Sequence, residues 1–274
     1  MCDVTAQGHF GLSDFGLMVS MCTEFTQALY DPSVFARCLQ TDIMDATRGT
    51  PDLHKEVFCQ LLTGYPRRAP AHHKDGWRDL LVELIRERTL QVHHVYDSAG
   101  PFQKETLLTV ALEAMMEDVS ALSRFKPVLL ALLTAGSRLD VRLDDGGATP
   151  LHHAIDVLSS HEQFLDEEVV ENFVKTAKAQ KVLRWTFETG PKATPLGPPG
   201  LMTACMNPLH LAFWRQNRLF VDVILKEDSS LNCFCELVWR ESEKLGAAKI
   251  SKRVPAWHIP IYSKDYSQWG LGSI

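Results

Sequence analysis

The chain has 274 residues, of which 45% are hydrophobic and 23% are charged, close to the average of globular proteins. This composition excludes a disordered chain and a bundle of membrane-spanning helices. The 28 basic and 34 acidic residues give a formal net charge of −6, which argues against nucleic acid as a partner.

The cysteines and the start of the chain indicate a compartment. Seven cysteines at irregular positions do not form the even disulfide framework of a small secreted protein. The start lacks a secretory signal, and the longest apolar stretch, residues 128–135, is too short to span a bilayer. We therefore expect reduced thiols and no membrane partner. The expected location is the cytoplasm, with or without the nucleus.

Residues 1–100 carry apolar spacings that predict four short helices but no clean internal repeat. The predicted helices lie at residues 15–29, 34–44, 53–62 and 77–85. We expect this region to be a set of degenerate repeats or a helical cap, because the terminal units of a repeat protein need a polar outer face.

Residues 101–229 contain a motif that recurs. Residues 149–154 read T-P-L-H-H-A, residues 207–212 read N-P-L-H-L-A, and residues 106–111 read T-L-L-T-V-A. This motif resembles the helix start of an ankyrin repeat, T-P-L-H-x-A. The resemblance implies a stack of helix pairs that are joined by turns.

The second helix of each pair is expected after each copy of the motif. The apolar patterns of residues 127–140 and 219–226 supply these helices, and Gly136 provides the turn after the first of them. Residues 165–184 are a long charged amphipathic stretch that belongs to the surplus before the last copy. The copies are farther apart than the usual period of about 33 residues. We expect the surplus at residues 117–125 and in a Pro/Gly-rich loop, residues 189–200, within an insertion near residues 184–205.

The residues of the motif have structural roles in this interpretation. Thr149 caps a helix, Pro150 fits its first turn, Leu151 packs against the neighbouring repeat, and His152 bonds to nearby backbone. Pro208, Leu209 and His210 repeat these roles in the later copy. We assign neither histidine to catalysis or to a metal.

A protein-binding surface is expected on the turns between repeats and on the first helices, where the fold itself does not dictate the residues. Six residues are the candidates for protein binding on this surface: Arg138, Arg142, Asp144, Asp145, His153 and Asp156.

No motif for catalysis, cofactor binding or metal binding occurs in the chain. Adjacent histidines point about 100° apart on a helix, and the C-x-C pair at residues 233–235 lacks the second pair of a zinc site. We expect no enzyme activity, no cofactor and no metal.

Residues 230–274 do not continue the repeat. Residues 230–240 are expected to form a helix, with Leu231, Cys235 and Val238 as an i, i+4, i+7 stripe. Ser230, Leu231 and Cys235 match the start of the box in ankyrin-repeat and SOCS-box proteins. That resemblance implies that Leu231 and Cys235 bind the elongin B and C pair of a cullin ubiquitin ligase. The alternative is a helix that only caps the last repeat.

The sequence as a whole predicts an all-α ankyrin-repeat solenoid of helix pairs, with a degenerate helical N-terminal region and a C-terminal capping helix plus tail. Its predicted function is non-catalytic protein binding by an adaptor, as a substrate receptor of a cullin ubiquitin ligase. Two alternatives stay open: an ankyrin scaffold or inhibitor without a ligase link, and an enzyme with an ankyrin support.

Overall fold

The computed structural model describes residues 51–63, 71–98, 102–117, 122–160, 166–188, 192–193, 201–231, 234–240 and 249–256. The described residues form two compact units. The first unit contains the described residues up to Asp97 together with Glu105–Arg138, and the second contains Ser98–Lys104 and the described residues from Leu139 onward.

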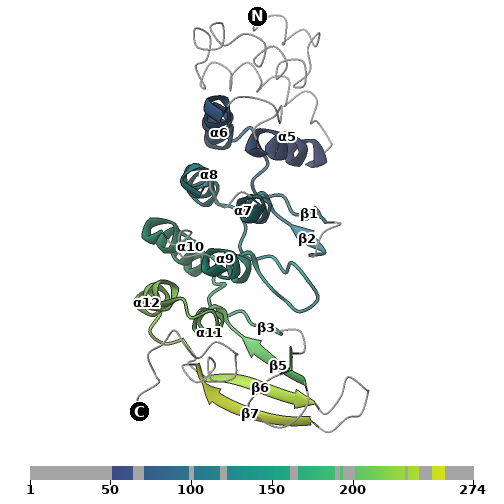
Figure 1. Ribbon diagram of the computed structural model, residues 1–274, viewed down its shortest axis with the longest axis vertical. Coiled ribbons are helices and arrows are strands. Elements are labelled where there is room, and N and C mark those ends of the chain that lie inside the picture. The colour runs from purple at the N-terminus through teal and green to yellow at the C-terminus, as the bar shows by residue number, and fades with distance from the viewer. Residues whose placement is uncertain are drawn as a thin grey trace, which may run out of the picture. The chain divides into compact units, whose positions relative to one another are not determined.

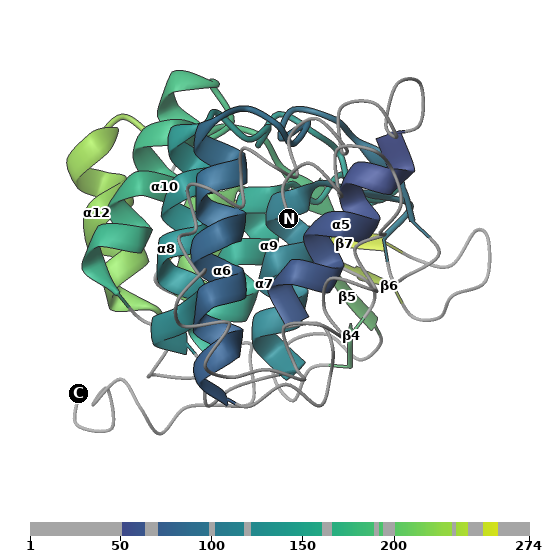
Figure 2. The same cartoon turned by 90° about the horizontal axis from the view of Figure 1, so that it is seen from above.

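The first unit consists of two layers of helices (Figures 1 and 2). Helices α5 (Pro51–Thr63) and α7 (Leu107–Glu117) pack together in one layer, and α6 (Ala71–Arg86) packs against α8 (Leu122–Thr134) in the other. Two short strands, β1 (Tyr96–Asp97) and β2 (Lys104–Glu105), pair beside them. Fully buried leucines and aromatic rings fill the space between the layers, among them Phe58, Leu80, Leu112 and Leu129.

The second unit repeats the two-layer arrangement. Helix α9 (Pro150–Ser160) packs against α10 (Glu167–Ala179) and α11 (Pro208–Trp214), and α12 (Arg218–Glu227) packs against α10 and α11. The turn before α9 projects from the side of α9 and α11, as Figure 1 shows.

An antiparallel sheet completes the second unit. Its strands are β3 (Phe187–Glu188), β5 (Leu201–Met206), β6 (Phe234–Arg240) and β7 (Lys249–Pro255) in that order, and β4 (Lys192–Ala193) also pairs with β5. Alternate residues face opposite sides of a strand, so Cys235 and Leu237 are buried while Phe234 and Glu236 are exposed. On the buried side of the sheet, β5 packs against α11.

Three helices begin with the same reciprocal capping. Asn207 Oδ1 accepts the His210 N–H at 2.9 Å, and His210 Nδ1 accepts the Asn207 N–H at 3.2 Å. Thr149 and His152 form the corresponding pair before α9, with Nδ1 accepting the Thr149 N–H at 3.2 Å. Thr106 and Thr109 do so before α7, where Thr109 Oγ1 accepts the Thr106 N–H at 2.9 Å. Each pair satisfies backbone donors that have no partner inside the helix.

Several helices also end in the same way, on a residue with positive φ. This residue is Arg88 (φ 57) after α6, Gly136 (φ 85) after α8, and Lys181 (φ 61) after α10. In each case the N–H of the next residue returns to a carbonyl five positions back, as in Val182 N to Ala177 O at 2.8 Å. Two of these left-handed positions therefore carry a long side chain where glycine is unstrained.

The prediction of an all-α ankyrin-repeat solenoid is wrong. The described residues contain eight helices but also two antiparallel sheets, and about a seventh of them lie in strands. Within the expected capping helix at residues 230–240, Phe234–Arg240 form strand β6. Its Phe, Val and Trp residues favour strands, and burial of Cys235 and Leu237 follows a period of two residues.

Some predicted boundaries also differ. Helix α8 begins at Leu122, five residues before the predicted start at Pro127, so part of the expected insertion at residues 117–125 is helical. Helix α10 ends at Ala179, before the predicted end at residue 184. The predicted helices at residues 15–29 and 34–44 and the tail beyond residue 256 lie outside the described residues, as does the Pro/Gly-rich loop apart from Lys192–Ala193.

We expect Lys181→Gly to raise the free energy of unfolding by about 1 kcal/mol. A residue with a Cβ atom is strained in the left-handed conformation, and glycine is not. Lys181→Ala is the matched control, since it removes the same charge but keeps a Cβ atom. Chemical denaturation of the three proteins measures the difference. An equal gain in both variants would assign the effect to charge and not to backbone strain.

Candidate functional site

The turn between Leu139 and Thr149 in the second unit is closed by its own hydrogen bonds. The Leu143 N–H donates to Ala148 O at 2.7 Å, and the Gly147 N–H donates to Asp144 O at 3.1 Å. Asp144 Oδ1 accepts the Ala148 N–H at 2.9 Å. Gly147 has φ 84, and a Cβ atom there would collide with the Arg142 side chain. The sequence Asp-Asp-Gly-Gly thus forms a fixed turn.

Arg142 connects this turn to the segment before β3. Its Nη1 donates to Gly147 O at 2.7 Å and to Thr186 O at 2.6 Å. Its guanidinium also lies 4.7 Å from the centre of the Trp185 ring, a cation–π contact. The Glu188 N–H adds a bond of 2.8 Å to Gly146 O. These contacts hold two exposed segments, about 40 residues apart in sequence, in one arrangement.

The short segment Ser98–Lys104 supports the same turn from within the second unit. The N–H groups of Gln103 and Lys104 donate to Leu143 O at 2.9 and 3.0 Å. The Phe102 ring lies edge-on to the His153 ring, with centroids 4.9 Å apart. The turn is therefore fixed to residues that precede it by about 40 positions.

A buried histidine, His152, and a half-buried one, His153, lie behind the turn. Burial and the Arg142 charge lower the pKa of His152 to about 3, against an opposing hydrogen bond from the ring to the Met206 backbone. Burial lowers the pKa of His153 to about 4, although Asp156 opposes it. His153 Nε2 is enclosed and has no hydrogen-bond partner among the described residues. Both rings are therefore neutral at pH 7.

The predicted protein-binding residues have different roles in the structure. Arg142 and Asp144 build the turn, and Asp145 is exposed on it. Asp156 accepts a hydrogen bond of 2.6 Å from Arg215 Nε on the side of α9 and α11. Arg138 is exposed but belongs to the first unit, so it is not part of this site.

The predicted motif residues lie at helix starts and in the core. Thr149 and His152 cap α9, Pro150 is its first residue, and Leu151 is fully buried. Pro208, Leu209 and His210 take the same places in α11, with Asn207 as the cap.

A pocket of about 630 Å³ adjoins this turn and opens on the exposed face of the sheet. Its volume is in the range of ligand-binding pockets. Its lining combines charged and polar groups with an apolar patch, and consists of Arg184, Thr186, Cys205, Asn207, His210, Ser230, Leu231, Phe234, Glu236, Ser251 and Arg253. Thr186 belongs both to this lining and to the segment that Arg142 holds.

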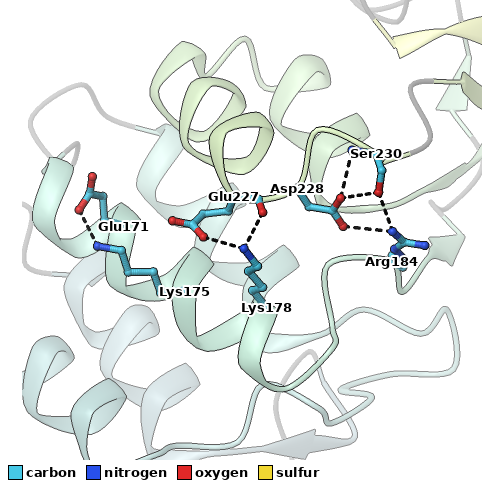
Figure 3. Close-up of polar contacts among 7 residues, drawn as sticks. All are labelled: Glu171, Lys175, Lys178, Arg184, Glu227, Asp228 and Ser230. Atoms are coloured by element: carbon cyan, nitrogen blue, oxygen red, sulfur yellow. Dashed lines mark hydrogen bonds and ion pairs between the residues drawn. The ribbon is translucent and has the colours of Figure 1, made fainter.

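The side chains at two edges of the pocket are held in place. Figure 3 shows Arg184 pointing toward Asp228 and Ser230, with Nη2 at 3.3 Å from Asp228 Oδ2 and 2.8 Å from Ser230 Oγ. The Ser230 hydroxyl donates to Asp228 Oδ1 at 2.6 Å, which holds the pKa of Asp228 below its usual value. On the other edge, the Arg253 guanidinium lies 4.9 Å from the centre of the Phe234 ring.

Ion pairs between α10 and α12 support this arrangement from behind. Lys178 Nζ bonds to the Glu227 carbonyl at 2.7 Å and to its carboxylate at 3.1 Å, and Lys175 pairs with Glu171 on α10 (Figure 3). These pairs are exposed, so each contributes little to stability. Of the two, only the bonds from Lys178 to Glu227 link α10 to the end of α12, directly before Asp228.

The two residues predicted to bind elongin do not lie on a helix. Leu231 lines the pocket but is only 4% exposed, and Cys235 is fully buried on the inner side of β6. Cys235 Sγ donates to Cys205 O at 3.3 Å, and burial raises the pKa of its thiol to about 12. The expected helix face that would present both residues is therefore absent from this segment.

Three further findings concern the described residues as a group. No set of three or more His, Cys, Asp or Glu side chains among them is placed to hold a metal ion. None of their helices is long and apolar enough to cross a membrane. The described cysteines, Cys59, Cys205 and Cys235, are free thiols.

The chain matches none of the protein-family models, curated proteins or solved structures with which it was compared.

Sequence reasoning missed the residues that face the turn. Arg184 is the last residue of the amphipathic stretch 165–184 and Trp185 follows it, while their partners Asp228 and Arg142 are more than 40 residues away. The aromatic pair Trp185 and Phe187, which flanks a single threonine, was a signal for a strand with one packed side.

Removal of the Arg142 clamp should loosen the two segments that it joins. We expect Arg142→Ala to accelerate amide hydrogen exchange at Glu188 and Ala148, and Arg142→Lys to restore protection only in part, because an ammonium cannot stack and bridge like a guanidinium. Lys175→Ala, on the exposed side of α10, is the control and should change neither amide. Unaltered exchange in Arg142→Ala would show that the clamp does not order the turn.

The second unit should lose stability at acidic pH through His152 and His153. Their pKa values are lower in the fold than the ordinary 6.5, so the unfolded state takes up these protons first as the pH falls. The contribution of the two histidines to the free energy of unfolding is fully present above about pH 6.5. It decreases toward pH 4, by up to about 1.4 kcal/mol per pH unit for each histidine. Denaturation of His153→Gln between pH 7 and pH 4 should give a shallower decrease than the parent chain.

Proposed function

We propose that the chain is a non-catalytic protein-binding module, and that its second unit binds a partner through the 139–149 turn and the adjoining pocket. The observation that carries this proposal is the bond from Arg142 to Thr186 O, because it joins the turn to the wall of the pocket. Rigid loops on a helical scaffold are common binding elements, and a preordered surface reduces the entropic cost of association.

The pocket supplies a place for an anchoring side chain of the partner. The exposed Phe234 ring offers apolar contact, while Arg184, Glu236 and Arg253 surround it with charge. Interfaces often concentrate binding energy in such a pocket with a polar rim. Asp145 on the turn and the Asp156–Arg215 pair on the helices extend the surface beyond the pocket.

The proposal covers protein binding and leaves the cullin ligase as a separate hypothesis. The ligase hypothesis needs a helix that inserts Leu231 and Cys235 into a groove of elongin. In strand β6 the Cys235 side chain is enclosed, so the geometry favours the alternative of a scaffold or inhibitor.

Site-specific cross-linking tests the proposed surface. A photoreactive benzoyl-phenylalanine at Cys205, an exposed position in the pocket, should cross-link a partner in an extract of the cells that make the protein. The same group at Arg218, whose side chain is 87% exposed on α12, is the control and should not. Arg142→Ala should lower the yield at position 205 several-fold. Equal yields at both positions would contradict the proposal.

Size-exclusion chromatography with purified elongin B and C tests the ligase hypothesis. We expect separate elution, because the predicted contact residues are enclosed in the fold. Co-elution that Leu231→Asp abolishes, while the melting temperature of the variant stays unchanged, would instead establish the ligase link. A lower melting temperature of Leu231→Asp is the expected result for a buried leucine.

A further inference from the structure

Helix α8 in the first unit carries apolar residues on both of its faces, with Lys126 and Thr134 as the polar residues among its described outward positions. Phe125, Val128, Leu129 and Leu132 face the core and are buried. The opposite face carries Pro127, Leu130 and Ala131, which are exposed or half-buried. A helix that is apolar all round is normally covered on all sides.

The outward face of α10 shows what an uncovered helix looks like in this chain. It carries Glu167, Glu168, Glu171, Lys175 and Lys178, and several of these side chains pair with one another or with α12. The described outward positions of α8 carry a single charge, Lys126. The outward face of α8 therefore carries fewer charges than that of α10 and offers apolar surface for a contact.

A groove of about 550 Å³ runs between this face and the end of α6. The residues of α8 and of its C-terminal end that line the groove fall in pairs one helical turn apart. The pairs run from Lys126 and Pro127 to Thr134 and Ala135, a length of roughly 12 Å. The small side chains of Ala131 and Ala135 leave room for close approach of another backbone. The shape therefore fits about two turns of a helix that lies along α8.

The walls of the groove are basic. Arg86, Arg88 and Lys126 line it, and no acidic side chain does. Glu83 pairs with Arg86 at 2.6 Å and offsets one of these charges, and Glu87 is exposed close by on the chain. This excess of positive charge occurs in a protein whose net charge is −6.

The backbone conformation at Arg88 is fixed by hydrogen bonds. The bonds from Arg88 N to Ile85 O (3.1 Å) and from Thr89 N to Leu84 O (3.0 Å) lock the residue in its left-handed conformation. Gly136 occupies the same position after α8. The chain thus keeps an arginine at the wall of the groove although glycine would relax the backbone.

We propose that the groove between α6 and α8 binds an acidic amphipathic helix of a partner protein. The leucine-type side chains of that helix would contact Pro127, Leu130 and Ala131, and its carboxylates would pair with Arg86, Arg88 and Lys126. This site is separate from the surface proposed for the second unit, and neither proposal depends on the other. Nucleic acid is the less favoured ligand, because three cations around an apolar floor are few for a polyanion.

Fluorescence anisotropy of the full chain with a labelled synthetic peptide tests this proposal. The probe is a helix of about 15 residues with Leu at i, i+3, i+4 and i+7 and Glu on both flanks, and the matched peptide carries Lys in place of every Glu. We expect the Glu peptide to bind, its affinity to fall as salt is raised, and the Lys peptide to bind at least tenfold more weakly.

Arg88→Gly separates binding from folding. This variant should raise the melting temperature of the chain, since it removes a left-handed arginine, and should weaken binding of the Glu peptide about five- to tenfold. Arg88→Lys should retain most of the affinity, and Lys181→Gly, which makes the same backbone change in the second unit, should retain all of it. Leu130→Glu should abolish binding.

Four results would overturn the proposal. The first three are equal binding of the Glu and Lys peptides, unchanged affinity in Arg88→Gly, and tighter binding of a labelled single-stranded DNA than of the Glu peptide. Failure of the Glu peptide to bind the full chain would overturn it as well.

Discussion

The second unit depends on the way in which its helices begin and end. Each helix leaves backbone donors without partners at its start and acceptors without partners at its end, and a stack of short helices multiplies this cost. The chain meets it with a reciprocal pair at the start, as in Asn207 and His210, and with a left-handed residue at the end, as in Lys181. Because these devices set where each helix stops, they also set where the exposed turns emerge.

The clamp around Arg142 follows from this framework. The capping pair of Thr149 and His152 fixes the end of the turn, and the left-handed Lys181 directs the chain toward Trp185 and Thr186. Arg142 then has two carbonyls and one ring within reach. Burial, and after it the Arg142 charge, lower the pKa of His152, so the same side chain that orders the surface affects the titration of the helix start beneath it.

The sequence predicted features that depend on local chemistry and failed on those that depend on distant contacts. The start of α9 at Pro150 was predicted correctly, because Thr-Pro-Leu-His carries its own capping partners. Strand β6 was predicted as a helix, since Leu231, Cys235 and Val238 fit a helical stripe equally well over so short a stretch. The pairing of β6 with β5 and β7 decided the outcome, and no local pattern encodes it. Among the site residues, Arg142, Asp144 and Asp145 were all predicted to bind a partner, whereas the role of Arg142 as a clamp depends on Thr186, which only the fold brings near.

The position of Ser98–Lys104 limits how the polypeptide can be divided. This segment supplies Phe102 beside His153 and two donors to Leu143 O, so it is part of the second unit, yet residues on both sides of it belong to the first. A single cut at the boundary near residue 138 would leave that support on the wrong fragment. The Leu143 carbonyl would lose both donors, and one edge of the His153 ring would be uncovered. The two units are therefore distinct in their packing but inseparable by one cleavage, and a fragment that begins after α8 is a poor substitute for the full chain.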